Sequence, residues 1–219
     1  MPDFFCMRHY QLFLLILLLF AGLLLFSGSS VWKKTITLHG PNMPVRPAPQ
    51  LSMPDGLRKK AASARLFVEQ NGYNDRLCFL VDMSLPSGQN RFFVYDLVKD
   101  TIAKAGLVTH GRCNEYWLEG RKYGNTVGCG CTSLGKYRIG YAYTGRFGLA
   151  YKLYGLEKTN DKAFERFVVL HAHDCVPDSE IKDDICQSDG CPTVAPGFLQ
   201  QLKPVLDVSR KPVLLWIYE

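Results

Sequence analysis

From Arg76 onward, the chain consists of short apolar runs, rich in β-branched and aromatic residues and separated by glycines and other turn formers. Runs of this length and composition, bounded by turn signals, are typical of β-strands. The predicted strands cover residues 77–82, 91–97, 136–142, 167–171 and 212–218. Pro86-Ser87-Gly88 lies between the first two runs and predicts a hairpin. This part of the chain is therefore expected to form a sheet.

Two segments have helical signals instead. Asp55 is a suitable N-cap for a helix over residues 56–69, and Asn71-Gly72 is a suitable end for it. A second helix is expected over residues 196–206. Residues 55–219 are therefore predicted to form one mainly β domain, a sandwich or barrel-like sheet with one or two flanking helices.

The N-terminal segment has the features of an export signal. Arg8 and His9 precede an apolar run over residues 12–26, and small residues follow at 27–30. Residues 1–30 are expected to be either a cleaved signal peptide or a hydrophobic helix that anchors the chain in the inner membrane. The basic flank keeps the N-terminus in the cytoplasm, so the rest of the chain is expected in the periplasm or cell envelope.

Residues 31–54 contain five prolines and predict an extended spacer between the export segment and the domain. With 219 residues in total, the chain is long enough for one domain with a substantial core. The net charge of +6 either favours anionic surfaces, such as cell-wall polymers or lipid headgroups, or reflects a mixed solvated surface. The basic residues are scattered, so a nucleic-acid partner is not expected.

Eight cysteines in an exported chain indicate disulfides. Setting aside Cys6, which precedes the apolar run, and Cys191, six cysteines remain and allow three bridges. A bridge from Cys175 to Cys186 is favoured because both lie on one loop. The alternative is a zinc site with Cys113, Cys129, Cys131 and His110 as ligands. Zinc sites usually separate paired cysteines by two to four residues, so no metal or other cofactor is expected.

The segment Ser188-Asp189-Gly190-Cys191-Pro192 is the strongest candidate for a catalytic site. Gly190 allows a tight bend that turns backbone N–H groups toward one point, where they can receive an oxyanion. Cys191 then has the position of a nucleophile. The alternative is that Cys191 is one half of a structural disulfide, and the spacing alone does not choose between the two.

A thiol with an ordinary pKa needs a base, and His171 is the candidate because it ends the apolar run 167–171. It precedes Cys191 by 20 positions, and the polar loop between them can bring thiol and imidazole together. His173 and His110 are secondary candidates for the same role. The alternative for His171 is a core histidine with no catalytic role.

Several motifs in order resemble the YkuD-like murein L,D-transpeptidase catalytic domain family over residues 76–219. They are Arg91 to Leu97, His110-Gly111, Ser133-Leu134-Gly135, Tyr143 to Gly148, Gly155-Leu156-Glu157 with Asn160, the run into His171, and Ser188 to Pro192. Two positions depart from the pattern. Asp189 stands where many members have His or Trp, and Ala172 stands where many have Gly or Ser.

The resemblance implies a cysteine acyl-transferase that acts on the stem tetrapeptides of peptidoglycan. His171 would take the proton of Cys191, the thiolate would form a thioester with loss of D-Ala, and an amine of another stem would complete a 3–3 crosslink. Gly190 and Cys191 would supply oxyanion N–H groups, and Ser188 would support the loop. At Ala172 a backbone carbonyl would have to fix the imidazole tautomer. Asp189 would hold an imidazolium, bind the acceptor amine or raise the thiol pKa.

Two alternatives remain open at this point. One is a hydrolase on the same scaffold, either an L,D-carboxypeptidase or an enzyme that releases a wall-attached lipoprotein. The other is a non-catalytic, disulfide-stabilised wall-binding module. The expected partners are peptidoglycan stem peptides, and the inner membrane if the N-terminal segment is not cleaved.

Overall fold

The computed structural model describes residue 53 and residues 56–219. The predicted export segment, Asp55 and all of the predicted spacer except residue 53 lie outside the described residues. Within the described part, no helix combines the length and the apolar character that crossing a membrane requires. The first described helix, α2, covers Leu57–Asn71 and has Gly56 at its N-cap position, with no side chain capping it. The expected end at Gly72 is confirmed, since Gly72 is the C-cap in a left-handed conformation.

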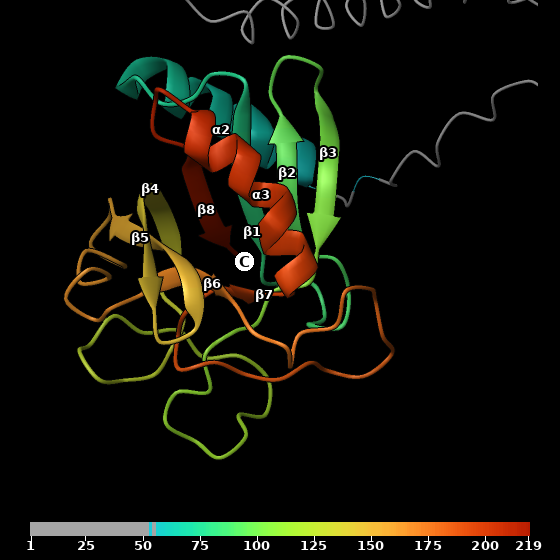
Figure 1. Cartoon of the computed structure of the whole chain (residues 1–219), viewed down its shortest axis with the longest axis vertical. Coiled ribbons are helices and arrows are strands. Elements are labelled where there is room, and N and C mark those ends of the chain that lie inside the picture. The colour runs from blue at the N-terminus through green and yellow to red at the C-terminus, as the bar shows by residue number, and fades with distance from the viewer. Residues whose placement is uncertain (1–52, 54–55) are drawn as a thin grey trace, which may run out of the picture. The chain divides into compact units, whose positions relative to one another are not determined.

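In residues 56–219, eight strands form one mixed sheet in the order β3-β2-β1-β8-β4-β5-β6-β7 (Figure 1). The strands are β1 Leu77–Asp82, β2 Phe92–Asp96, β3 Thr101–Gly106, β4 Gly135–Gly145, β5 Gly148–Gly155, β6 Val169–Ala172, β7 Thr193–Val194 and β8 Leu214–Tyr218. The β1–β2 hairpin is antiparallel as expected, while β1–β8 and β6–β7 are parallel pairs. The prediction of a mainly β domain with one or two flanking helices is confirmed.

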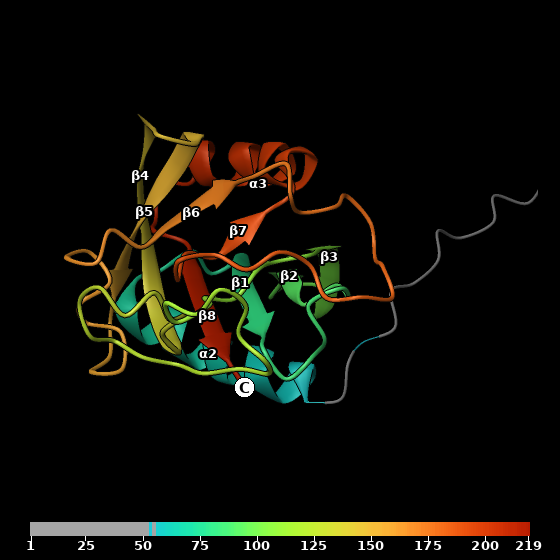
Figure 2. The same cartoon turned by 90° about the horizontal axis from the view of Figure 1, so that it is seen from below.

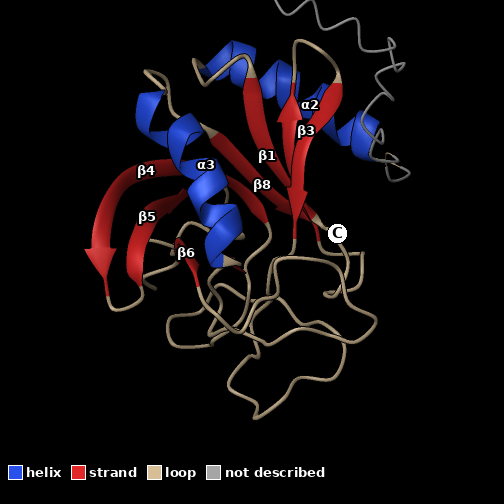
Figure 3. Cartoon of the chain, turned by 45° about the vertical axis from the view of Figure 1, so that its right-hand side comes forward, coloured by secondary structure: helices blue, strands red, loops and turns tan. Residues whose placement is uncertain are grey.

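The central strands carry apolar side chains on both faces, because the sheet is covered on both sides. In β1, Phe79 and Val81 belong to the larger core cluster, which includes residues of helix α3, Pro196–Val208. The alternate residues Cys78 and Leu80 pack in a second cluster with α2. The two helices therefore lie on opposite faces (Figure 3). Burial on both faces explains why these strands read as continuous apolar runs.

The predicted strand over 167–171 begins two residues later than expected. Phe167 has a φ of 57°, a left-handed conformation that interrupts an extended strand. Strands β3, β5 and β7 were not predicted. The β3 sequence is Thr-Ile-Ala-Lys-Ala-Gly, which lacks a strong strand preference, and β5 begins and ends with glycine. Strand β7 has two residues, too few for a periodic pattern.

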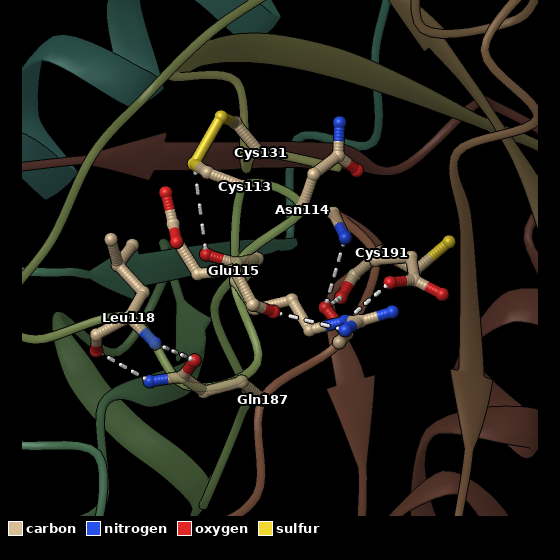
Figure 4. Close-up of polar contacts among 12 residues, drawn as sticks. Cys113, Asn114, Glu115, Leu118, Cys131, Gln187 and Cys191 are labelled. Carbon is tan, nitrogen blue, oxygen red and sulfur yellow. Dashed lines mark hydrogen bonds and ion pairs between the residues drawn. A yellow bond between two sulfur atoms is a disulfide. The ribbon is translucent and has the colours of Figure 1, made fainter. Parts of the chain in front are cut away.

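Two long connections, residues 107–134 and 173–192, gather at the end of the sheet near β6 and β7 (Figures 1 and 2). The Gly111–Ser188 bridge joins the two connections directly, and Val108 of the first connection pairs with Val194 of β7. The side-chain amide of Gln187 also donates to Leu118 O and accepts from Leu118 N, both at 2.8 Å (Figure 4). The segment that leads into Cys191 is thereby held against the first connection.

The described residues contain two disulfides, Cys113–Cys131 and Cys175–Cys186. The predicted Cys175–Cys186 bridge is confirmed. A third bridge between the remaining candidates does not form, because Cys78 is buried beneath α2 whereas Cys129 lies on a loop. The sulfurs of Cys113 and Cys131 are bonded to each other, which removes two of the four ligands considered for zinc. In residues 56–219 no cluster of three or more His, Cys, Asp or Glu side chains is arranged to hold a metal ion.

Candidate active site

Cys191 and His171 line the same pocket at the end of the sheet. His171 is on β6, and Cys191 precedes β7, the parallel neighbour of β6. Cys191 has a free thiol and is partly exposed. The parallel register places His171 opposite Thr193, two residues beyond Cys191, so adjacent strands deliver the thiol and the imidazole to one site.

The His171 ring is fixed by contacts at both nitrogens. Its Nδ1 lies 3.0 Å from Ala172 O, and its Nε2 lies 3.0 Å from Thr193 Oγ1. A carbonyl can only accept, so Nδ1 carries the proton and Nε2 is left as the basic nitrogen, accepting from the Thr193 hydroxyl. Phe147 stacks on the ring with centroids 4.7 Å apart. Burial lowers the pKa of His171, with the nearby His173 contributing in the same direction, so the neutral form is favoured.

The turn before Cys191 requires glycine. Gly190 has a φ of 107°, and a Cβ at this position would lie 2.6 Å from Cys131 O. Ser188 stabilises the same turn, because its Oγ donates to Cys191 O at 2.7 Å and accepts from Gly190 N at 3.2 Å. The Gly190 N–H is thus occupied. Among the described residues, no acceptor is found for the Cys191 N–H, which makes it the available oxyanion donor of the two.

The first long connection supports the turn from the opposite side. The Thr109 hydroxyl donates to Cys191 O at 3.2 Å, and the Thr109 N–H donates to Thr193 O at 2.9 Å. One residue further, His110 O accepts the Ser188 N–H at 2.9 Å. These bonds pair residues 109–110 with the segment 188–193, so the turn that carries the nucleophile is held by the first long connection and continues into β7.

Opposing effects act on the Cys191 thiol. Burial raises its pKa, and the Asp189 carboxylate adds to this. The Val169 N–H, which points at Sγ from 3.5 Å, and the Arg166 guanidinium act in the opposite direction and favour the thiolate. The sulfur also lies 3.8 Å from Phe167 O, to which the protonated thiol can donate.

The other predicted residues occupy different positions. Asp189 forms an exposed ion pair with Arg112 at 2.8 Å, so its carboxylate is bonded away from the His171 ring. His173 lines the pocket, is exposed, and accepts the Cys175 N–H at Nδ1. His110 is buried and is not part of the pocket lining. Its side chain contacts Arg91, so its contribution to the site is through its backbone.

Some residues of this site were not identified from the sequence. They are Thr109, Arg112, Phe147, Arg166, Gln187 and Thr193. Thr193 follows Cys191 by two positions, so the two residues share a face where the chain is extended into β7, a strand that was not predicted. Phe147 occupies the tight turn between β4 and β5, which the strand prediction did not include. The remaining contacts depend on how the two long connections fold.

Comparison with protein families gives a match to the L,D-transpeptidase catalytic domain over residues 52–218. Comparison with curated proteins finds no match. Among solved structures, the chain is similar to the helical cell shape determining protein Pgp2 (K307A mutant) from Campylobacter jejuni, with 15% identity and a TM-score of 0.44. The alignment covers 76% of this chain and 57% of that one.

A second similar structure is that of LD transpeptidase LdtMt1 in complex with imipenem, with 10% identity and a TM-score of 0.39. This alignment covers 65% of the present chain and 59% of the other. The chain thus spans less than two thirds of the length of either protein.

Proposed function

Because the chain belongs to the L,D-transpeptidase catalytic domain family, we propose that it is a cysteine acyl-transferase that forms 3–3 crosslinks between stem tetrapeptides of peptidoglycan. The observation that carries this proposal is that Cys191, with a free thiol, and His171, with a basic Nε2, line one pocket. A nucleophile, a base and a third group that orients the base are the minimum for acyl transfer through a covalent intermediate.

In the first step, His171 Nε2 accepts the proton of the Cys191 thiol. Ala172 O holds Nδ1–H throughout, which keeps Nε2 as the proton acceptor. The Thr193 hydroxyl stabilises both states, because it donates to neutral Nε2 and can accept from Nε2–H once the proton has moved. Phe147, stacked on the ring, limits its rotation and its access to water.

The thiolate then attacks the carbonyl between the third residue of the stem and D-Ala. The Cys191 N–H stabilises the oxyanion, and Gly190 and Ser188 hold that N–H in place. His171 returns its proton to the departing amine, so D-Ala leaves as a neutral amine and the donor stem remains as a thioester on Cys191. No metal or organic cofactor takes part in this sequence.

An amine from another stem attacks the thioester and completes the crosslink. Water in place of the amine would give the hydrolase reaction with the same residues, and it is therefore one outcome of the test below. The absence of a disulfide at Cys191 in the described structure supports an enzyme over a non-catalytic wall-binding module. The two disulfides support a location outside the cytoplasm, in the cell envelope.

The test is mass spectrometry of the full chain incubated with tetrapeptide muropeptides, next to three variants. We expect an adduct on Cys191 corresponding to loss of D-Ala, followed by crosslinked dimers. Cys191→Ala removes both, and His171→Ala lowers turnover by about 100-fold or more. Cys129→Ala is the matched control, because it removes another free thiol that is not part of the pocket lining, and should retain activity.

The products distinguish the alternatives. Tripeptide without dimers would replace the transpeptidase with the hydrolase. Turnover that survives in Cys191→Ala would exclude both, and an intact wild-type protein that forms no adduct would indicate the wall-binding module.

A further inference from the structure

Arg166 connects the nucleophile turn to the first long connection. Its Nη1 donates to Gly124 O at 3.0 Å and to Ser133 Oγ, and its Nη2 donates to Cys131 O at 2.5 Å. The side chain is partly buried. None of the ion pairs found in the described part of the chain includes Arg166, so its guanidinium is bound by neutral oxygens and keeps an uncompensated positive charge.

The guanidinium lies directly beneath the turn that presents Cys191. Nη2 is 3.2 Å from the position that a Cβ on Gly190 would occupy, and its acceptor Cys131 O is 2.6 Å from the same point. The residues that follow Arg166 approach the sulfur: Phe167 O lies 3.8 Å from Sγ and Val169 N lies 3.5 Å from it. One short segment, 166–169, therefore supplies a charge and a backbone donor around the thiol.

A fixed positive charge near the sulfur is needed because the His171 imidazolium, the other group that could stabilise a thiolate at Cys191, is disfavoured. Burial raises the pKa of Cys191 and lowers the pKa of His171, so a resting thiolate–imidazolium pair is disfavoured from both sides. Arginine stays protonated at any relevant pH. Its attraction for the sulfur lowers the pKa of Cys191 and opposes the effect of burial.

The remaining charged and titratable groups near the sulfur do not supply this charge. Asp189 acts in the opposite direction and is already paired with Arg112. His173 is on the pocket wall and has its Nδ1 occupied by the Cys175 N–H. Cys175 is in a disulfide and does not titrate.

We propose that Arg166 is a positioning residue that ties the Gly190–Cys191 turn to residues 124–133 and whose fixed positive charge stabilises Cys191 as a thiolate. The inference rests on the proposed function in that it concerns the same nucleophile. It predicts a property of the thiol, however, that can be measured without any peptidoglycan substrate.

The experiment measures the alkylation rate of Cys191 by iodoacetamide between pH 5 and 10, in the full chain, with each cysteine followed by peptide mass spectrometry. The variants are Arg166→Gln, Arg166→Lys and the control Arg138→Gln. Arg138→Gln removes the same charge from a residue that stacks on Tyr154 and does not line the pocket.

In Arg166→Gln we expect the Cys191 titration midpoint to rise by about one pH unit, with alkylation about tenfold slower at pH 7. Arg138→Gln should behave as wild type. Arg166→Lys keeps the charge and should keep the midpoint within about half a unit of wild type. Arg166→Lys also tests the proposal if Arg166→Gln does not fold. A folded Arg166→Lys variant whose Cys191 midpoint rises by a full unit would overturn it.

An unchanged Cys191 midpoint in a folded Arg166→Gln variant would overturn the proposal, as would an equal rise in Arg138→Gln. These outcomes are separate from a failure of the proposed function. Wild-type protein without turnover on muropeptides would reject the transpeptidase, and the effect of Arg166 on the thiol would still be observed.

Discussion

His110 shows how strongly its surroundings determine what a histidine can do. It was a secondary candidate for the base, and it lies in the sequence close to the residues that support Cys191. Its ring is 4% exposed and its Nδ1 accepts from Arg91 Nη2 at 3.2 Å. Burial, with the charges of Arg91 and Arg121 adding to it, lowers the pKa of His110 to about 4. Protonation of His110 Nδ1 would set its N–H against the N–H of Arg91 Nη2, so the neutral ring is favoured.

This environment predicts a pH dependence of stability. The folded-state pKa is about 4 and the unfolded value is near 6.5, so between these values the unfolded chain binds more protons. The stability contributed by neutral His110 is therefore complete above pH 6.5 and is lost as the pH falls toward 4, by about 3 kcal/mol in total. His110→Asn keeps an acceptor for Arg91 without a titrating ring.

Urea unfolding at several pH values between 4 and 7.5 checks this prediction. The free energy of unfolding of wild type should fall with acidification more steeply than that of the Asn variant. Parallel curves for the two proteins would show that His110 does not titrate as its burial indicates.

At the scale of elements, helix α3 packs on one face of the sheet and directly follows β7, the strand after Cys191. Phe198, Leu199 and Leu202 of α3 are in the larger core cluster, and Phe92 of β2 packs edge-on against Phe198 with centroids 5.3 Å apart. The helix begins one residue after Ala195, directly behind β7. Packing of α3 therefore also restrains the segment that carries Cys191 and Thr193.

Truncation of one α3 side chain measures this packing. Leu202→Ala leaves a cavity at a fully buried position and should lower the free energy of unfolding by about 3 kcal/mol. Val208→Ala, on the same helix at 77% exposure, should change it by less than about 0.5 kcal/mol. Chemical denaturation of the two variants gives both numbers, and similar losses would contradict the placement of α3 on the sheet.

At the scale of the whole molecule, covalent bonds and apolar burial stabilise different regions. Both disulfides are in the long connections that surround the candidate site, where few apolar side chains are buried. The sheet and its helices are held by apolar packing, and Cys78 remains a buried free thiol within that packing. The connections around the site thus depend on disulfide formation for their rigidity, whereas the sheet depends on apolar packing.

The division between the two regions predicts a labelling pattern. In native protein, iodoacetamide should label Cys129 and Cys191 but not Cys78, which is 0% exposed. Cys78 should react only when the sheet unfolds, and Cys113, Cys131, Cys175 and Cys186 only after reduction. Peptide mass spectrometry of labelled native, denatured and reduced samples checks each class. Rapid labelling of Cys78 in native protein would contradict its position beneath α2.

The sequence by itself determined the fold class, most central strands, and Cys191 and His171 as two of the residues that line the pocket. Burial on both faces leaves a continuous apolar run in the sequence, as in β1. The Gly190-Cys191 pair and the apolar run into His171 are likewise visible in a few neighbouring residues. The Cys113–Cys131 disulfide and the absence of a third bridge among the described cysteines were not determined, because spacing does not encode which loops meet. The domain limits and the export segment stay predictions, since they fall on residues outside the described part.

Only the tertiary structure decided which groups surround Cys191. Arg166, Thr109 and Phe147 come from segments far from it in sequence, and no local rule links them to a thiol. The structure also separated the three histidines that the sequence offered as bases: His171 in the pocket with a basic nitrogen, His173 on its exposed wall, and His110 buried against Arg91. The physical reason is that burial and charge depend on distance in space, which the long connections set when they fold onto each other.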